Sequence, residues 1–561
     1  MYNVELYAIN YNIMLDFYTK TCYNYNMGIQ HVRQRTQKIK GTVYVYEDYP
    51  YWDADKQQTR HKRVYIGKKD DSGIFIPNKT WLNRSQTGTG SEPQDRPAIA
   101  RRTYFGVTWL LDSIAKRTSI DQDLRACFPR DHEKIRSLAS YLVCESESPM
   151  YRFGRWAHTH WHPYGEPLTS QRISELFAGI DHQACMRFFA KQRRRYSEQE
   201  HLAYDITSIS SYSELIRHVR YGKNKNAEPL PQINLALIFG QSSMMPVYYR
   251  RLPGNVTDVT TIRKLLRDLD EMDFGRVKLV LDRGFYSAKN IDALYLHRCK
   301  FILGARKSTL FVRRHLDRYR NKVTDFTCYD PELGLHYLSL TDKWPYQEYD
   351  NEGNVVAGSE RRIYVHIYYN GGQAESEKAA FFRQLSQVKA ALLEGGCSEQ
   401  QQVMAEKFFE VSTTPVRGTR IEYREQAIRE HTRNFGYFVL LSNQIKDPRQ
   451  ALWVYRNKDL VEKSFGNLKN RLNMRRPMVS SEESLDGKLF VQFIALMLVS
   501  WIHKVMKEHG LYKTWTMQEL LDELDIIERY NVEGKRPHYG EVTGKQRKIY
   551  ESFGFTAPDM L

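Results

Sequence analysis

The chain has 561 residues, more than one hydrophobic core accommodates, so about three or four domains are expected. Its 83 Lys and Arg outnumber 66 Asp and Glu, and the net charge of +17 favours a polyanionic partner such as nucleic acid. Seven cysteines without a CxxC pair argue against a disulfide framework or a cysteine-rich zinc site and are typical of a cytoplasmic protein. The longest apolar run, residues 489–502, is shorter than the ~20 residues that span a membrane, so we predict a buried core helix and no membrane partner.

The N-terminal part predicts an irregular segment followed by a small sheet. Residues 1–40 begin with a Tyr- and Asn-rich stretch that lacks periodicity, so we expect a lead-in without regular structure, in which Met27 is a candidate natural start. Residues 41–80 alternate in polarity around a DDSG turn, which predicts a β-meander, and the polar residues 81–100 are typical of a linker. Five basic side chains of this region would either contact DNA or form a solvated face: Lys56, Arg60, His61, Lys62 and Arg63.

Residues 101–200 carry apolar side chains three or four positions apart, which predicts helices. The last two of these helices meet near Gly179, and the second ends in three candidate DNA-binding residues, Arg193, Arg194 and Arg195. Two short helices around such a turn are typical of a helix-turn-helix DNA-binding element. An ordinary helical hairpin with a basic end fits the pattern equally well.

The motif HTHWH places three histidines on alternate residues: His158, His160 and His162. On a strand these side chains would share one face and could bind a metal ion. No cysteine or further histidine-rich segment completes such a site, so a loop without metal is the favoured interpretation.

The remaining chain predicts an α/β domain with an insertion. Residues 201–305 contain three strands in succession and then alternating helices and strands, which indicates a meander extended by parallel crossovers. Residues 306–445 combine charged strands, a DNEGN turn and one long helix, which we interpret as a β-rich insertion domain. Residues 446–510 would complete the α/β domain, and residues 511–561 predict a helical C-terminal region that contains a capping box.

Three carboxylates are candidates for a metal-dependent site. Asp205 lies in the first strand of the α/β region, and Asp282 ends a later strand. Glu462 lies in a helix-like stretch in which Tyr455 and Lys458 precede it by seven and four residues, on one helical face. Such a cluster would repel itself unless cations neutralise it, and hard oxygen ligands suit Mg²⁺ or Mn²⁺ in phosphoryl transfer. Taken singly, each carboxylate also fits a turn or a solvated helix face.

Four sequence blocks, in this order, resemble the DDE transposases of bacterial insertion sequences. They are YDITS around Asp205, PGNVTD at 253–258, DRGFYS around Asp282, and the pattern Tyr-x2-Lys-x3-Glu-x6-Lys that runs from Tyr455 to Lys469. The last block is similar to the Tyr-x2-Arg-x3-Glu-x6-Lys signature of the insertion-sequence-four type. Lys458 stands where that group usually has Arg, which keeps the charge but loses bidentate phosphate contact. The resemblance covers roughly residues 40–560.

This resemblance implies an α/β RNase H-like catalytic core that is interrupted by the β-rich insertion domain, with the small β-meander and a helical DNA-binding region before it. It implies that Asp205, Asp282 and Glu462 are catalytic and bind Mg²⁺ or Mn²⁺, and that Tyr455, Lys458 and Lys469 contact DNA. Related enzymes place an aromatic side chain of the insertion against a flipped base. Trp344 is the candidate for that role, and a packed core tryptophan is the alternative.

The function that the resemblance implies is that of a transposase. It would cleave double-stranded DNA at the ends of an insertion sequence and join the freed 3′-OH to target DNA, as a homodimer or higher oligomer in the bacterial nucleoid. Two alternatives stay open: a metal-dependent nuclease on the same fold, and a non-catalytic DNA-binding repressor from a decayed element.

Overall fold

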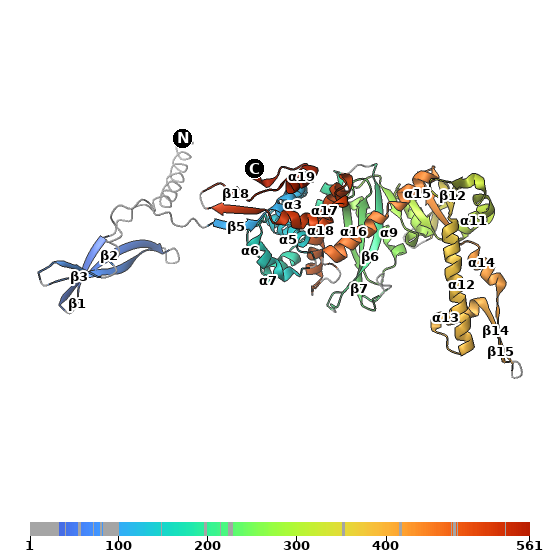
Figure 1. The fold of residues 1–561 in the computed structure, drawn as a ribbon, viewed down its shortest axis with the longest axis horizontal. Coiled ribbons are helices and arrows are strands. Elements are labelled where there is room, and N and C mark those ends of the chain that lie inside the picture. Colours follow the sequence, from blue (N-terminus) through green and yellow to red (C-terminus); the bar gives the residue numbers. More distant parts are fainter. Residues whose placement is uncertain are drawn as a thin grey trace, which may run out of the picture. The chain divides into compact units, whose positions relative to one another are not determined.

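The structure is a computed structural model. It describes residues 33–39, 41–53, 58–70, 72–78, 81, 100–146, 148–195, 199–213, 215–222, 228–349, 354–414, 418–472, 474, 478–479, 481–532 and 535–560. The chain divides into two compact units, residues 1–98 and 99–561, which are described separately (Figure 1).

The described part of the first unit is a four-stranded antiparallel sheet in which strands adjacent in sequence are adjacent in space. Its strands are β1 (Arg33–Ile39), β2 (Thr42–Asp53), β3 (Gln58–Lys69) and β4 (Phe75–Pro77). The prediction that residues 1–40 lack regular structure is therefore wrong for β1. This strand reads RQRTQKI and pairs with β2 along its whole length. Because its described side chains are exposed, no alternation of apolar residues marks it. The basic residue Lys56 and the candidate start Met27 lie outside the described residues.

The second unit is built on a mixed sheet, which among the described residues has nine strands in the order β11-β12-β13-β16-β10-β9-β6-β7-β8. Strand β9 pairs in parallel with β6 and β10, and the other neighbours are antiparallel. The predicted α/β mixed-sheet core is therefore confirmed. The strands are β6 (His201–Ser210), β7 (Gln232–Gly240), β8 (Pro246–Pro253), β9 (Lys278–Leu281), β10 (Lys300–Ala305), β11 (Tyr329–Asp330), β12 (Leu335–Tyr349), β13 (Val355–Tyr369) and β16 (Tyr437–Ser442).

The local sequence explains the centre of this sheet. Every residue of β7 is buried, and its sequence QINLALIFG is correspondingly apolar on both faces. Helix α9 (Asp258–Glu271) connects β8 to β9, and α10 (Ala288–Leu296) connects β9 to β10. Each helix therefore carries the chain back to the end of the sheet at which the previous strand began, so that the next strand can run in the same direction. As a result, Asp205 within β6 lies beside Asp282, which follows β9.

Helix α17 (Glu482–Glu508) is the central helix of the second unit and contacts α5, α7 and β8. Among the described helices it is the one that is long and apolar enough to cross a membrane, but 83% of its apolar window is buried inside the protein. The predicted buried core helix at 489–502 is thus confirmed. Two shorter helices, α15 (Pro448–Arg456) and α16 (Asp459–Gly466), precede it and contact the sheet.

Residues 100–195 form a helical layer, as predicted, but they are joined to the C-terminal region. Strand β5 (Ala100–Tyr104) pairs with β17 (Glu528–Val532), which also pairs with β18 (His538–Tyr539). The helical region predicted at 511–561 therefore also contains strands, which were not predicted because strand pairing with a segment more than 400 residues away leaves no local sequence signal. The helices of both parts are α3 (Gly106–Arg117), α4 (Ile120–Cys127), α5 (His132–Cys144), α6 (Phe153–Thr159), α7 (Ser170–Ala178), α8 (His182–Arg193), α18 (Met517–Asp525) and α19 (Gly544–Ser552).

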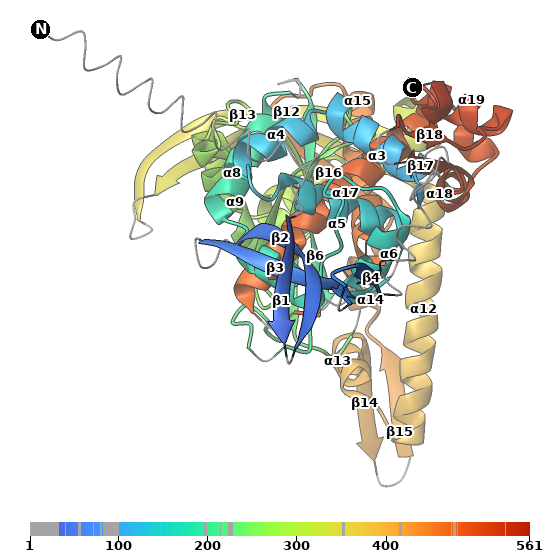
Figure 2. The same ribbon diagram turned by 90° about the vertical axis from the view of Figure 1, so that its left-hand side faces the viewer.

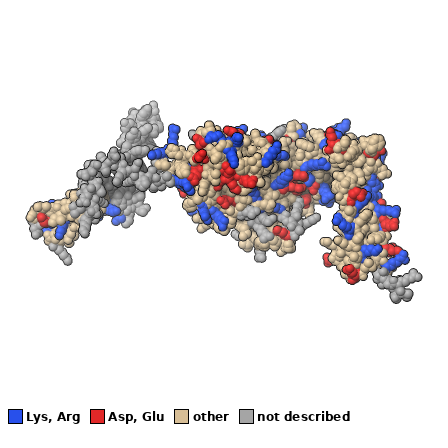
Figure 3. Space-filling view, in the orientation of Figure 1, with Lys and Arg blue, Asp and Glu red and all other residues tan. Residues whose placement is uncertain are grey.

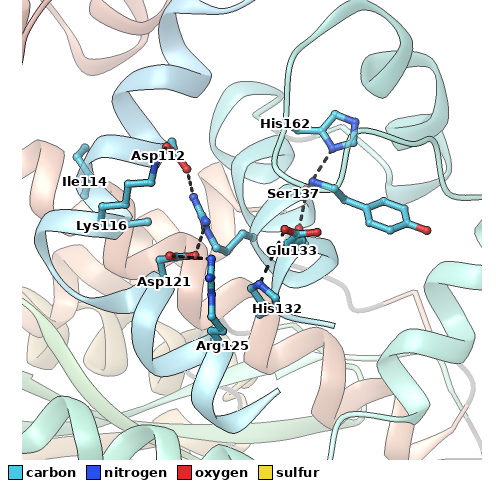
Figure 4. A network of polar contacts seen from close by, with 12 residues as sticks. Asp112, Ile114, Lys116, Asp121, Arg125, His132, Glu133, Ser137 and His162 are labelled. Atoms are coloured by element: carbon cyan, nitrogen blue, oxygen red, sulfur yellow. Dashed lines mark hydrogen bonds and ion pairs between the residues drawn. The ribbon is translucent and has the colours of Figure 1, made fainter. Parts of the chain in front are cut away.

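A buried arginine fastens three of these helices together (Figure 4). The Arg136 guanidinium of α5 donates to Asp112 of α3 and to Asp121 of α4, and its side chain is only 7% exposed. Lys116 adds a second cation to Asp112, with 2.7 Å between Nζ and Oδ2. Two buried or nearly buried carboxylates are therefore neutralised by cations on neighbouring helices.

The three histidines of the HTHWH motif do not share a face. His158 is exposed on α6, whereas His160 and His162 are buried after it. His160 Nε2 lies 3.2 Å from Asp525 Oδ2. His162 Nδ1 lies 3.0 Å from the Ser137 hydroxyl, as Figure 4 shows. Both buried rings thus serve packing and hydrogen bonding, and the metal interpretation is wrong because α6 ends within the motif instead of continuing as a strand.

The insertion at 306–445 differs from its prediction as a separate β-rich domain. Its strands β11, β12, β13 and β16 extend the core sheet, and α11 (Leu310–Val323) packs on β12 and β13. The part that projects from the body is mostly helical (Figures 1 and 2). It has its own apolar core around Phe381 and Phe408. Its elements are α12 (Gly371–Glu394), α13 (Glu399–Phe408), the hairpin β14 (Phe409–Thr414) and β15 (Gly418–Tyr423), and α14 (Glu425–Thr432).

Candidate active site

Two of the predicted carboxylates lie on neighbouring parallel strands. Tyr204 of β6 pairs with Leu281 of β9, so Asp205 and Asp282 follow at the same level of the sheet. Adjacent strands run about 4.8 Å apart, which brings the two backbones as close as a sheet allows. The crossover through α9 is what unites these residues, although they are far apart in sequence.

The third carboxylate comes from α16, which contacts β6 and β7. The predicted single helix through Tyr455 and Lys469 is interrupted. Helix α15 ends at Arg456, Lys458 caps the start of α16, and the π-helical turn Asn467–Arg471 follows. The spacing nevertheless brings Tyr455, Lys458 and Glu462 together, because the chain stays helical in φ and ψ between α15 and α16. Lys469 lies in the π-helical turn and not on the helix of Glu462.

Hydrogen bonds and ion pairs join these side chains. The Tyr455 hydroxyl donates to Asp282 Oδ1 over 2.7 Å. The Lys458 ammonium lies 3.8 Å from the same oxygen and 3.2 Å from Glu462 Oε1. A Cβ atom on Gly304 of β10 would lie 2.5 Å from the Tyr455 hydroxyl, so only glycine at that position permits this approach. Lys458 is thus the cation between two of the three carboxylates, and Asp205 also acts on its charge.

These contacts define the charge state of the site. Burial alone would raise the pKa of Asp282, but the Tyr455 hydrogen bond and the charges of Lys458 and Arg283 outweigh it and lower the pKa. For Lys458 burial would lower the pKa, and the carboxylates of Asp282, Glu462 and Asp205 outweigh it and raise the pKa. Burial and the Asp282 charge raise the pKa of Tyr455. At neutral pH the site therefore holds a carboxylate at Asp282, an ammonium at Lys458 and a neutral phenol.

The donor set suits a hard divalent cation, but the side chains are not assembled as a closed metal site. In the part of the chain that the structure describes, no three His, Cys, Asp or Glu side chains form a group that could hold a metal ion. Lys458 supplies the neutralising charge in this arrangement, and the Glu462 side chain is 59% exposed and extends toward solvent. Carboxylate oxygens are the ligands that Mg²⁺ prefers, so the residue types present fit a hard divalent cation.

A cavity of about 810 Å³ opens beside Asp282, between the ends of β9 and β10 and the start of β16. Three of its lining side chains are cationic besides Lys458, namely Arg283, Arg306 and Lys307, and two are acidic, Asp282 and Glu377. Arg306 is held by the backbone carbonyls of Arg283 and Gly284, at 3.2 and 3.0 Å. Lys307 Nζ donates to the Asn434 carbonyl over 2.7 Å, and burial lowers its pKa. A cavity with these walls suits a phosphodiester.

The distribution of surface charge on the second unit does not by itself indicate a DNA-binding surface. Figure 3 shows Lys and Arg side chains interspersed with Asp and Glu over the visible described face of that unit. The cationic cavity beside Asp282 is therefore the more specific indication, since it combines positive walls with the carboxylates.

The predicted helix-turn-helix arginines have three different environments. Arg193 is buried, and its guanidinium lies over the Phe274 ring at 5.3 Å. Arg195 pairs with Asp123 of α4, with 2.7 Å between Nη2 and Oδ1. Arg194 is exposed. The prediction that Arg193 contacts DNA does not agree with its burial, because a guanidinium that packs α8 against the core is not accessible to DNA.

The flipped-base candidate Trp344 is a core residue. Its side chain is 3% exposed, and its indole nitrogen donates to Asp292 over 2.8 Å. Its ring also packs edge to face on Phe311, with 4.9 Å between centroids. The alternative of a packed core tryptophan is therefore the correct one, because β12 joins the sheet and carries Trp344 inward.

The mixed α/β sheet thus carries two carboxylates on neighbouring parallel strands, with a cationic cavity beside Asp282. The family model for the transposase DDE domain matches residues 196–498, more than half of the chain, and the protein belongs to that family. No curated protein is similar enough to the chain to count as a match.

One solved structure with similarity is that of the piggyBac transposase synaptic complex with hairpin DNA. The identity is 10%, the TM-score is 0.31, and the similarity covers 64% of this chain and 58% of the other, less than two thirds of its length. A likeness this weak carries no argument for the fold or the function.

Proposed function

We propose that this transposase cuts DNA at the ends of an insertion sequence of the insertion-sequence-four type and joins the freed 3′-OH to target DNA. The observation that carries the proposal is the alignment of Asp205 and Asp282 on neighbouring parallel strands, with Glu462 reached through Lys458. The strand order β8-β7-β6-β9-β10, with β6 parallel to β9, supports the proposal of an RNase H-like core. Two alternatives remain. A nuclease that does not join strands would have the same arrangement of carboxylates, and a non-catalytic repressor would bind DNA without using them.

Asp205, Asp282 and Glu462 would hold Mg²⁺ or Mn²⁺, which when bound supplies Lewis-acid activation of the attacking oxygen and stabilises the leaving oxygen. The chain's own residues prepare the site. Tyr455 fixes Oδ1 of Asp282, and Lys458 keeps the carboxylates from repelling one another before the substrate arrives.

The cationic cavity supports a substrate role for the residues around Asp282. Arg306 and Lys307 line it and are held by backbone carbonyls, so they present positive charge without pairing with an acid in those contacts. In the proposal they neutralise the phosphodiester next to the scissile one, and Tyr455 and Lys458 contact the backbone at the cut. Lys469 and the exposed Arg194 would add DNA contacts further along the duplex.

The proposed partners are double-stranded transposon ends and target DNA in the bacterial nucleoid. Cutting both ends of one element requires two active sites in one complex, so we propose a homodimer or higher oligomer on DNA.

The test incubates purified protein with Mg²⁺, a duplex that carries the inverted repeats flanking the gene, and a supercoiled target plasmid. Asp282→Asn should lower cleavage and strand transfer by more than about a hundredfold while DNA binding persists. Asp273→Asn is the matched control, since Asp273 is exposed, precedes β9 and has a φ of 53° that asparagine tolerates. Cleavage without joining would favour the nuclease, and cleavage unchanged in Asp282→Asn would refute both enzymatic proposals.

A further inference from the structure

The sheet of the first unit presents clustered tyrosines on one face. Tyr44 and Tyr46 of β2 are two residues apart and point to the same side, and Tyr65 of β3 lies against both. The centroid of the Tyr65 ring is 5.7 Å from that of Tyr44 and 5.8 Å from that of Tyr46. Val45, between the two tyrosines of β2, alternates to the other side and is 3% exposed. The apolar core of the sheet is therefore on the opposite side, and the tyrosines are not needed to build it.

The same face carries cations held in place by one carboxylate. Asp48 follows Tyr46 by two residues and is 2% exposed. Its Oδ2 lies 3.0 Å from Arg35 Nε and 3.1 Å from His61 Nδ1, and its Oδ1 lies 3.8 Å from Arg63 Nε. The side chains of Arg35 and Arg63 remain 52% and 54% exposed. Two guanidiniums thus share one buried acid, which orients them and leaves an excess of positive charge toward solvent.

We name the tyrosine face as Tyr44, Tyr46, Tyr65, Arg35 and Arg63, and we infer that it binds single-stranded DNA. Tyrosine rings on a sheet stack on unpaired bases, and guanidiniums beside them neutralise the phosphates of the same strand. Tyr65 is 39% exposed, so its ring offers area for such stacking.

The choice of partner follows from the combination of rings and cations. The bases of an intact duplex are stacked on one another and cannot reach rings that lie on a sheet. An acidic peptide would use the guanidiniums but would leave the three rings without a role. This inference adds a binding surface that is separate from the carboxylate site and does not depend on catalysis.

The experiment measures binding of the full chain in the Asp282→Asn background, without divalent cations, by fluorescence anisotropy. The probes are a labelled oligothymidine of about 20 nucleotides and a blunt duplex of the same length. Tyr65→Ala should weaken binding of the single strand about tenfold, and Tyr65→Phe should retain it, since the ring and not the hydroxyl stacks. Arg63→Ala should weaken it severalfold, whereas Lys62→Ala, which removes the same charge one residue away on the opposite face, should change it less than twofold.

Unchanged binding of the single strand in both Tyr65→Ala and Arg63→Ala would overturn the inference. Equal losses on the single strand and the duplex would also overturn it, since they would assign the face to duplex backbone. Competition by polyglutamate equal to that by unlabelled oligothymidine would assign it to acidic protein instead. Thermal unfolding of each variant confirms that the sheet is intact, and Arg35→Ala gives a second charge variant if Arg63→Ala does not fold. Because cleavage is not measured here, failure of this inference leaves the proposed transposase activity untouched.

Discussion

Tyr455 donates its hydroxyl hydrogen to Asp282 across 2.7 Å and so joins helix α15 to the end of strand β9. This bond passes directly over Gly304, whose lack of a side chain makes room for the phenol. It couples the position of a carboxylate to the helix that leads into α16 and Glu462.

Tyr455→Phe should therefore lower cleavage by about tenfold with little change in DNA binding, because Asp282 loses the group that orients it. The pKa of Asp282 should rise without the hydrogen bond, so the acidic limb of the pH–rate profile should move to higher pH. Tyr437→Phe, which alters another tyrosine of the same cavity wall, is the control. A rate and profile equal to those of the parent protein would show that the bond does not position Asp282.

Lys458→Met tests whether the Lys458 ammonium neutralises the carboxylates of Asp282 and Glu462 when no metal is bound. Without it, Asp282 and Glu462 repel each other, so the melting temperature of the metal-free protein should fall. Added Mg²⁺ should then raise the melting temperature more than in the parent protein, because the cation no longer competes with an ammonium. Lys463→Met, an exposed lysine on the same helix, should change neither quantity. An unaltered response to Mg²⁺ in Lys458→Met would contradict the exchange of one cation for the other.

Arg136→Met should destabilise the helical layer strongly. The substitution leaves Asp112 and Asp121 without their shared guanidinium (Figure 4), and breaking a buried pair from one side costs about 3–5 kcal/mol. Arg125→Met removes an arginine that is 65% exposed and 3.7 Å from Asp121, and should cost less than about 1 kcal/mol. Urea unfolding followed by circular dichroism measures both. A similar loss of unfolding free energy in the two variants would mean that burial of the arginine does not determine how much it stabilises the protein.

Two buried histidines should make the protein less stable in mild acid. Burial lowers the pKa of His162 and of His366 to about 4, from an ordinary value of 6.5. Between these values the unfolded chain binds protons that the folded chain does not, so stability should fall as the pH drops from about 6.5 to 4 and be unaffected above that range. His366→Gln should flatten this part of the curve of unfolding free energy against pH. A slope identical to that of the parent protein would show that His366 is not neutral in the folded state.

Much of the centre of the fold follows from local patterns. The strands that carry Asp205 and Asp282 are recognisable because their apolar runs are bounded by turns, and the crossover helix between them is amphipathic. The spacing of Tyr455, Lys458 and Glu462 predicts that they share a helical face, although not that the helix divides into α15 and α16. The DDE transposase family is indicated by the order of these blocks and confirmed by the family model.

Other features depend on residues that are distant in sequence. Whether Arg193 faces DNA or the core is decided by Phe274. Whether Trp344 receives a base or packs is decided by Asp292 and Phe311. The strands β12 and β13 belong to the core sheet only because β13 pairs with β16, which follows the projecting helices.

The sequence by itself therefore indicated the family of the protein and the elements that carry Asp205, Asp282 and Glu462, because helical and strand periodicity act over a few residues. The tertiary structure alone decided that Lys458 stands among the carboxylates, that Tyr455 holds Asp282, and that a sheet in the first unit turns its tyrosines outward. Burial and charge neutralisation depend on which helices and strands pack against each other, and local periodicity does not specify that packing.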